Sequence, residues 1–233
     1  MRKIVVLSGA GISAESGIST FRDSNGLWEG HDVQEVATPE AWRNDYKLVL
    51  RFYGERLKAA RKAKPNAAHR ALASLEEFFE VTIITQNVDD LHERAGSSRV
   101  IHLHGELGKA RSTFEETFLV DIPDGKTIQP GDKCPRGSQL RPHIVWFGEP
   151  VPMIEKAAYE CLSADVFIVV GTSMVVYPAA GLIDYVPAVA PKFIIDPKTP
   201  EVSDYPGTVF IKEKATKGMA LVKDRLLQDF VMM

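Results

Sequence analysis

Short runs of apolar, mostly β-branched residues recur along the chain and predict buried strands. The clearest run is Val166-Phe167-Ile168-Val169-Val170, which is apolar throughout, as in a strand of a parallel sheet covered on both faces. Runs of this kind predict strands at Lys3–Leu7, Val81–Thr85, Val100–Leu103, Val166–Val170, Lys192–Ile195 and Thr208–Ile211.

Helical patterns fall between these runs. Thr38 and Pro39 suit the cap and the first turn of a long helix. Helices are predicted at Pro39–Lys62, Ala67–Phe78, Val88–Ala95, Met153–Ser163, Ala179–Tyr185 and Lys217–Phe230. The alternation of strands and helices predicts an α/β fold with a doubly wound, mostly parallel, Rossmann-like sheet.

Two segments depart from this alternation, and a third segment, after them, carries a further strand pattern. Residues 24–66 are largely helical, and residues 106–142 are rich in glycine, proline and charge. Val145–Glu149 reads as a short strand whose edge an extended peptide could join. The alternative for this last segment is a core strand that ends at a turn.

A glycine-rich turn follows the first predicted strand. Gly9-Ala10-Gly11-Ile12-Ser13-Ala14 fits the pattern G-x-G-x-x-G/A, whose glycines let a backbone approach a pyrophosphate at the N-terminus of the next helix. A tight glycine turn without a ligand is the alternative. A dehydrogenase would continue to a second strand that ends in Asp or Glu about 20 residues on. This chain continues with the polar loop 19–28 instead, which weakens an oxidoreductase interpretation.

The polar loop carries two side chains with ligand-binding chemistry. Arg22 is suited to a bidentate contact with phosphate, and Phe21 is suited to cap a ring. The alternative makes Phe21 a core residue and Arg22 a member of a surface ion pair.

Polar side chains also leave the ends of two later strands. Gln86, Asn87 and Asp89 follow a predicted strand at the edge where open α/β sheets bind ligands, and their groups suit a carboxamide and ribose hydroxyls. The alternative is that Asn87 or Asp89 caps the next helix. His102 and His104 share one face of a strand, but no third metal ligand is nearby. We expect His104 in the cleft as a neutral base, and His102 in a structural role.

Composition narrows the class of protein. The chain has 233 residues, 45% of them hydrophobic, and a net charge of −3, which gives no electrostatic case for nucleic acid binding. Its two cysteines, Cys134 and Cys161, cannot form a disulfide framework, so a reducing, cytoplasmic location is expected. No apolar window approaches 18 residues, and no association with a membrane is expected.

Taken together, the motifs resemble those of the sirtuins, the NAD-dependent protein lysine deacylases. The motifs on which this resemblance rests are GAGISAESGISTFRD (residues 9–23), TQNVD (85–89), LHG (103–105), FGE (147–149) and GTS (171–173). The resemblance is greatest to bacterial sirtuins that remove acidic acyl groups. It implies a single catalytic domain over residues 1–233, in which insertions at about 24–66 and 106–142 form a smaller module. It also implies NAD as cofactor and acylated-lysine proteins or peptides as substrates, and we expect a monomer.

The resemblance also assigns roles to residues. Asn87 and Asp89 would form the nicotinamide pocket, and His104 would deprotonate the nicotinamide ribose hydroxyls after the acyl oxygen has attacked the anomeric carbon. The cofactor contacts would come from Gly9, Ala10, Gly11, Ser13, Glu15, Phe21, Arg22, Trp28, Gln86, Asn87, Asp89, Gly171, Thr172, Ser173, Asp196 and Ala215. The substrate contacts would come from Tyr53, Arg56, Val145, Phe147, Gly148, Glu149 and Val175.

The chain departs from the family in the segment 106–142. Most sirtuins carry four zinc-binding cysteines here, whereas this chain has Cys134 alone and Ser112 where the first cysteine is expected. One thiolate cannot hold a tetrahedral zinc, so no metal is predicted. The module is expected to be held by packing of apolar side chains, at Phe114, Phe118, Leu119 and Ile122.

The acyl preference depends on Tyr53 and Arg56. They lie three residues apart in a predicted helix, so they share a face, and sirtuins active on acidic acyl groups carry Tyr-x-x-Arg at this place. A guanidinium grips a carboxylate through two bonds while a phenol donates a third. Ala14 also resembles that class and leaves room for a longer acyl chain. The alternative makes Tyr53 a packing residue and Arg56 the partner of a surface acid.

Two other activities stay open at this stage. One is ADP-ribosyl transfer to protein, which the family resemblance also allows. The other is a non-catalytic protein that senses NAD, against which the presence of His104, Asn87 and Asp89 argues.

Overall fold

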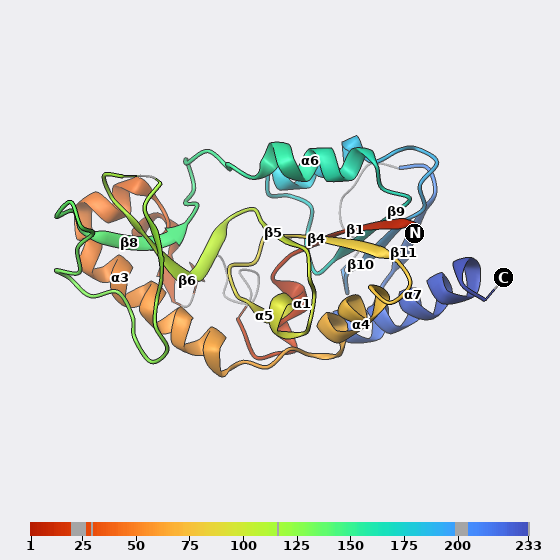
Figure 1. Ribbon diagram of the computed structural model, residues 1–233, viewed down its shortest axis with the longest axis horizontal. Coiled ribbons are helices and arrows are strands. Elements are labelled where there is room, and N and C mark those ends of the chain that lie inside the picture. Colours follow the sequence, from red (N-terminus) through yellow and green to blue (C-terminus); the bar gives the residue numbers. More distant parts are fainter. Residues whose placement is uncertain (20–26, 29, 116, 199–204, 233) are drawn as a thin grey trace.

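The computed structural model describes residues 1–19, 27–28, 30–115, 117–198 and 205–232. The chain forms two parts that lie side by side (Figure 1). The larger part is a sheet with helices on both faces, and the smaller part is built around one long helix and a short antiparallel sheet.

The larger part contains a six-stranded sheet in which all neighbouring strands are parallel. In spatial order the strands are β11 (Thr208–Ile211), β10 (Lys192–Ile195), β9 (Val166–Val170), β1 (Lys3–Ser8), β4 (Glu80–Thr85) and β5 (Val100–His102). The predicted strands are therefore confirmed, with end shifts of one residue at most. The chain builds outward from β1 to β5, then returns to β9 and builds the other way. The switch point lies between β1 and β9, where open α/β sheets bind ligands.

Helices bury the two faces of this sheet. On one face α4 (Ala67–Leu75) and α7 (Ala215–Phe230) pack over alternate strand residues such as Val6 and Ile168. On the other face α6 (Ile154–Leu162) and the 3₁₀ helix η1 (Ala179–Tyr185) pack over Leu7 and Val169. Figure 1 shows α6 on one side of the sheet, with α4 and α7 on the other. No helix in the part of the chain that the structure describes is both long and apolar enough to cross a membrane.

The smaller part joins the two segments that break the strand–helix alternation. The first contributes β2 (Leu27–Trp28), β3 (His31–Asp32), α2 (Val33–Val36) and α3 (Pro39–Lys62). The second contributes β6 (Gly105–Ser112), β7 (Leu119–Asp121) and β8 (Leu140–Ile144), paired antiparallel in the order β7-β6-β8. Both segments bury side chains in one apolar cluster of Val36, Ala37, Ala41, Val49, Phe52, Tyr53, Leu57, Ala60, Leu107, Ile144 and Trp146.

Part of the packing predicted for residues 106–142 is wrong. Phe114, which lies outside any strand, is 74% exposed. Leu119 is 44% exposed, because β7 is an edge strand with all three residues outside the core. Ile122 does pack against the apolar clusters, while Phe118 is only half-buried. A second small cluster is formed instead by Leu50, Ala110 and Ile128, with Trp42, Tyr46, Ile122 and Leu140 packed against it.

The predicted strand Val145–Glu149 is also wrong. Strand β8 ends at Ile144, and Phe147 and Gly148 form a turn in which Gly148 has φ +87°. A positive φ suits glycine and ends a strand. The segment is fastened by main-chain bonds, since Val145 N–H donates to the carbonyl of His104 at 2.9 Å and Phe147 N–H to that of Ala37 at 3.0 Å.

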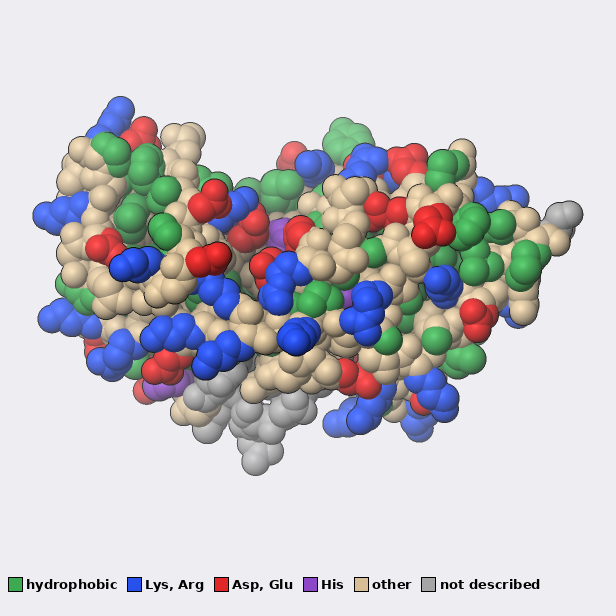
Figure 2. Space-filling view, turned by 60° about the horizontal axis from the view of Figure 1, so that its bottom comes forward, with side chains coloured by type: hydrophobic (Ala, Val, Ile, Leu, Met, Phe, Trp, Pro, Cys, Tyr) green, Lys and Arg blue, Asp and Glu red, His purple; other side chains and the backbone are tan. Residues whose placement is uncertain are grey.

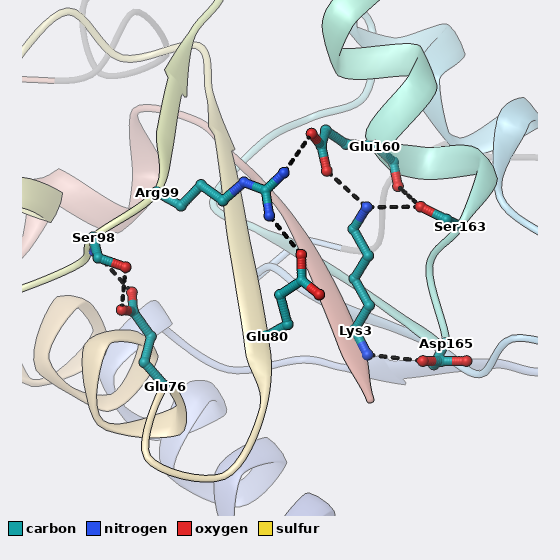
Figure 3. A network of polar contacts seen from close by, with 8 residues as sticks. All are labelled: Lys3, Glu76, Glu80, Ser98, Arg99, Glu160, Ser163 and Asp165. Carbon is teal, nitrogen blue, oxygen red and sulfur yellow. Dashed lines mark hydrogen bonds and ion pairs between the residues drawn. The ribbon is translucent and has the colours of Figure 1, made fainter. Parts of the chain in front are cut away.

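An ion network ties the starts of the central strands together (Figure 3). The Lys3 ammonium group lies 2.7 Å from Glu160 of α6 and donates to Ser163 at 2.6 Å. Arg99, just before β5, bridges Glu160 and Glu80, the first residue of β4. This network lies at the edge opposite the carboxyl ends of the strands, so the edge that binds ligands takes no part in it.

Candidate active site

A single cleft of about 1410 Å³ gathers the predicted site residues. It exceeds the roughly 300–1,000 Å³ of a typical ligand pocket, which leaves room for two substrates. Every predicted cofactor or substrate residue whose side chain the structure describes lines this cleft. Phe21 and Arg22 lie outside the described residues, and Trp28 is described only as part of the backbone of β2. Charged side chains of both signs are interspersed over the face of the molecule shown in Figure 2.

Glycines bring the ends of β1 and β9 into contact at the floor of the cleft. Gly9 N–H donates to the carbonyl of Val170 at 3.0 Å and Gly11 N–H to that of Gly171 at 2.8 Å. A Cβ on Gly11 would lie 2.7 Å from Gly171 Cα, and one on Gly171, which has φ +66°, would lie 2.3 Å from Ile12 N. Larger residues would force the two turns apart. The helix that follows, α1 (Gly11–Ala14), is only four residues long.

A hydrogen-bonded chain of side chains links this turn to the end of β4. The Asn87 amide nitrogen donates to the carbonyl of Gly9 at 3.2 Å and to Ser13 Oγ at 3.1 Å. The Ser13 hydroxyl donates in turn to Asp89 Oδ2 at 3.1 Å. Both amide hydrogens of Asn87 are thus engaged, and its carbonyl oxygen is the group suited to accept from a ligand.

Asp89 combines the two roles considered for it from the sequence. Its Oδ1 accepts from the N–H of Leu91, the first residue of α5 (Leu91–Arg94), at 3.1 Å, so it serves the start of that helix. It also lines the cleft while almost fully buried. Burial raises the pKa of Asp89, and the bonds from Leu91 and Ser13 oppose that rise.

His104 has the environment of a neutral base. Its Nδ1 lies 3.0 Å from the carbonyl of Gln86, and because a carbonyl only accepts, Nδ1 carries the hydrogen. In the neutral ring the lone pair is then on Nε2. Burial lowers the pKa of His104 below 6.5, so the ring is uncharged near neutral pH.

His102 differs from His104, as the sequence suggested. Its Nδ1 lies 3.1 Å from the carbonyl of Asn87 and its Nε2 lies 2.7 Å from Glu93 Oε1, and the residue is not part of the cleft lining. Burial lowers its pKa, but the Glu93 carboxylate, the Asn87 carbonyl and Glu106 together outweigh burial, and the pKa of His102 is raised overall. Within the described ranges, no group of three or more His, Cys, Asp or Glu side chains could hold a metal ion.

The far end of the cleft joins β10 to α7. Asp196 follows β10, is buried, and accepts from the N–H of Lys198 at 2.9 Å. Ala215 is the first residue of α7. Glu15 accepts from the N–H of Thr216 at 3.0 Å and from its hydroxyl at 2.9 Å. The carboxylate of Glu15 thus caps α7 and fastens the glycine turn to that helix.

Helix α3 forms the opposite wall of the cleft. Tyr53 is buried and Arg56 half-buried, and both line the cleft. Burial raises the pKa of Tyr53, so its hydroxyl stays protonated and able to donate. The Arg56 guanidinium carbon lies 5.8 Å from the centre of the Phe52 ring.

Trp146 is a cleft residue that the sequence patterns did not single out. It is 2% exposed, and the Arg141 guanidinium carbon lies 3.4 Å from the centre of its ring. Arg141 also bonds both carboxylate oxygens of Glu149, at 2.8 and 2.9 Å, and Glu149 accepts from Trp146 N–H at 2.9 Å. Glu149 lines the cleft as predicted, but its carboxylate holds the loop. The one arginine among the otherwise mostly apolar residues Leu140 to Trp146 is the feature of the sequence that could have indicated this contact.

The remaining cysteine of the 106–142 segment lies beside a hydroxyl. Ser112 Oγ–H donates to Cys134 Sγ at 3.4 Å, and the same oxygen accepts from the N–H groups of Phe114 and Glu115 at 3.1 and 3.0 Å. Ser112 therefore anchors the turn at the place where a metal-binding cysteine was expected. The absence of zinc stays a prediction.

Comparisons with known proteins agree on one family. The model of the Sir2 family matches residues 9–178. A protein of Bacteroides thetaiotaomicron named NAD-dependent protein deacylase is 48% identical over 97% of this chain and 99% of its own length. One of the same name from Helicobacter pylori is 47% identical over 98% and 99%. The crystal structure of a Sir2 homologue in complex with NAD matches with a TM-score of 0.88 and 40% identity, over 97% of this chain and 90% of that one.

Proposed function

This chain belongs to the Sir2 family of NAD-dependent protein deacylases, and on that premise we propose that it prefers lysines that carry succinyl or malonyl groups. The acyl group would pass to ADP-ribose, with release of nicotinamide and free lysine. The observation that carries the preference is the presence of Tyr53 and Arg56 together on the α3 wall of the cleft.

The residues at the sheet edge fit NAD. When bound, NAD supplies the anomeric carbon that takes the acyl oxygen. The side-chain oxygen of Asn87 and the Asp89 carboxylate, both buried, are acceptors for the two hydrogens of a carboxamide. The Asp196 carboxylate, buried beside the cleft, suits the hydroxyls of the adenosine ribose. The close glycine turns after β1 and β9 let the backbone reach the phosphates.

His104 is proposed as the general base. Nδ1 is committed to the Gln86 carbonyl, so Nε2 accepts the proton of a ribose hydroxyl. The carbonyl keeps the ring in one tautomer and one orientation throughout, and it stabilises the imidazolium that forms. Burial, which lowers the pKa, keeps the base ready at neutral pH.

Tyr53 and Arg56 are proposed to bind the terminal carboxylate of the acyl group. Arg56 supplies a charge-assisted, bidentate contact and the protonated Tyr53 supplies a further donor. A hydrogen bond to a charged group contributes roughly 1.5–3 kcal/mol. That range corresponds to about tenfold to a hundredfold in specificity over acetyl-lysine, which offers no carboxylate.

The variant Arg56→Met tests the preference. We expect kcat/KM for a succinyl-lysine peptide to fall about tenfold to a hundredfold, while kcat/KM for the acetyl-lysine peptide is retained or rises. Arg51→Met is the matched control, because Arg51 is exposed on the same helix. Equal losses on both peptides in Arg56→Met would show that Arg56 is structural and would refute the proposed preference.

A further inference from the structure

The loop between β4 and α5 carries Asn87 and Asp89 without regular secondary structure. Residues 86–90 form neither helix nor strand. Two main-chain bonds hold this loop on either side of Asn87, from Gln86 N–H to the carbonyl of Ser8 at 2.9 Å and from Leu107 N–H to the carbonyl of Val88 at 2.8 Å. A site that binds one face of a small ring needs its groups held within a fraction of an ångström. The contacts made at Asn87 itself, between these two main-chain bonds, therefore determine how well the pocket is formed.

The peptide groups on both sides of Asn87 are held by side chains. On one side, Asn87 N–H donates to Thr85 Oγ1 at 3.0 Å, and that oxygen also accepts from the buried Ser8 hydroxyl at 2.9 Å. On the other side, the Asn87 carbonyl accepts from His102 Nδ1 at 3.1 Å. His104 holds the preceding carbonyl, that of Gln86, at 3.0 Å. His102 and His104, at and just after the end of β5, thus donate hydrogen bonds to two consecutive main-chain carbonyls of the loop.

The two histidines differ in what lies behind them. His104 faces the cleft, whereas His102 has its other nitrogen 2.7 Å from the Glu93 carboxylate. A carbonyl and a carboxylate both only accept, so both ring nitrogens of His102 carry hydrogens. The doubly protonated, positively charged ring therefore lies between residues 86–90 and α5, and its side chain is only 9% exposed.

We propose that His102, held by Glu93, is a positioning residue for the nicotinamide pocket and acts through the carbonyl of Asn87. The proposal rests on the function proposed above, which places the nicotinamide beside Asn87 and Asp89. While His102 holds the main-chain carbonyl of Asn87, the side-chain amide of Asn87 keeps its bonds to Gly9 and Ser13. The side-chain oxygen Oδ1 of Asn87 then stays at the pocket. His102 itself need not touch the substrate.

A pair of variants separates positioning from bulk structure. His102→Leu removes the donor, whereas His102→Asn places an amide nitrogen near the position of Nδ1 and can keep the bond to the Asn87 carbonyl. We expect His102→Leu to raise the inhibition constant of nicotinamide and to lower kcat/KM for NAD, each about tenfold, the effect of losing one buried hydrogen bond. His102→Asn should restore both to within about threefold. The KM for the acyl-lysine peptide should stay the same in both variants.

His143→Leu is the matched control, since His143 is a part-buried histidine of β8 outside the cleft lining, and it should leave the nicotinamide constant unchanged. Thermal unfolding of each variant shows that it is folded. Equal nicotinamide constants in wild type and His102→Leu would overturn the proposal, as would failure of Asn to rescue or a parallel rise in peptide KM. The ratio of wild-type rates on succinyl and acetyl peptides tests the proposed acyl preference separately.

Discussion

Burial shifts the pKa of three residues that line the cleft. It lowers the pKa of His104 and raises the pKa of both Asp89 and Tyr53. Each shift favours the uncharged form, and each group has a different use for it. A neutral His104 can act as a base and a protonated Tyr53 as a donor, while the bonds from Leu91 and Ser13 oppose the rise in the pKa of Asp89.

His104→Ala should abolish deacylation. A general base typically contributes about 10²–10⁴-fold in rate, whereas NAD affinity rests on the glycine turns and the residues at the strand ends. Turnover is measured by nicotinamide release. NAD affinity is measured by calorimetry, and this affinity should change no more than a few-fold.

Near wild-type turnover in His104→Ala would contradict the assignment of the base. The wild-type enzyme offers a second readout. If His104 is the base, it acts in its neutral form. Because burial lowers its pKa, the acid limb of the pH profile should then have its midpoint below 6.5, the ordinary value for histidine.

At the scale of elements, the strands could be predicted from the sequence almost to the residue. Continuous apolar runs such as Val166–Val170 have one low-energy place, the buried middle of a sheet, and the structure confirms it. Helix α3 was also predicted with its bounds, because Thr38 and Pro39 mark its start.

The elements that border the cleft were predicted less well. The expected helix Val88–Ala95 is reduced to Leu91–Arg94. The carbonyl of Val88 accepts from Leu107 N–H at 2.8 Å instead of from a helical N–H, and Asp89 accepts from the N–H of Leu91 at the start of the shorter helix. The expected strand Val145–Glu149 is a loop held by Arg141, whose contacts with Glu149 and Trp146 come from tertiary structure that periodicity does not report. The sequence motifs still brought together the candidate residues at the sheet, such as Asn87 and Gly171, because these residues follow strand ends that share one edge.

The antiparallel element of the smaller part should fold without metal. Cys134 has the Ser112 hydroxyl as its neighbour, and a tetrahedral zinc needs four ligands. We expect elemental analysis to find no stoichiometric zinc, and a chelator to leave the thermal unfolding temperature unchanged. One zinc per chain, or unfolding on chelation, would show that ligands from elsewhere in the chain complete a site.

At the scale of the whole molecule, bonds from side chains to backbone carbonyls fasten the two walls of the cleft to each other. Arg94 of α5 donates to the carbonyls of Ala60, at 3.1 Å, and Ala63, at 2.5 Å, at the end of α3. Asn66, which follows α3, donates to the carbonyl of Ile12 at 2.7 Å. The helix that carries Tyr53 and Arg56 is therefore fastened to the loops that carry the cofactor residues, so the acyl group and the anomeric carbon can be held in register.

The most direct test of this arrangement is mass spectrometry of succinyl-, malonyl- and acetyl-lysine peptides of one sequence, incubated together with the enzyme and NAD. We predict faster loss of the succinyl and malonyl groups than of the acetyl group, with one nicotinamide and one O-acyl-ADP-ribose formed for each lysine released. Equal or faster removal of acetyl would contradict the proposed role of Tyr53 and Arg56, and lysine release without O-acyl-ADP-ribose would contradict acyl transfer itself.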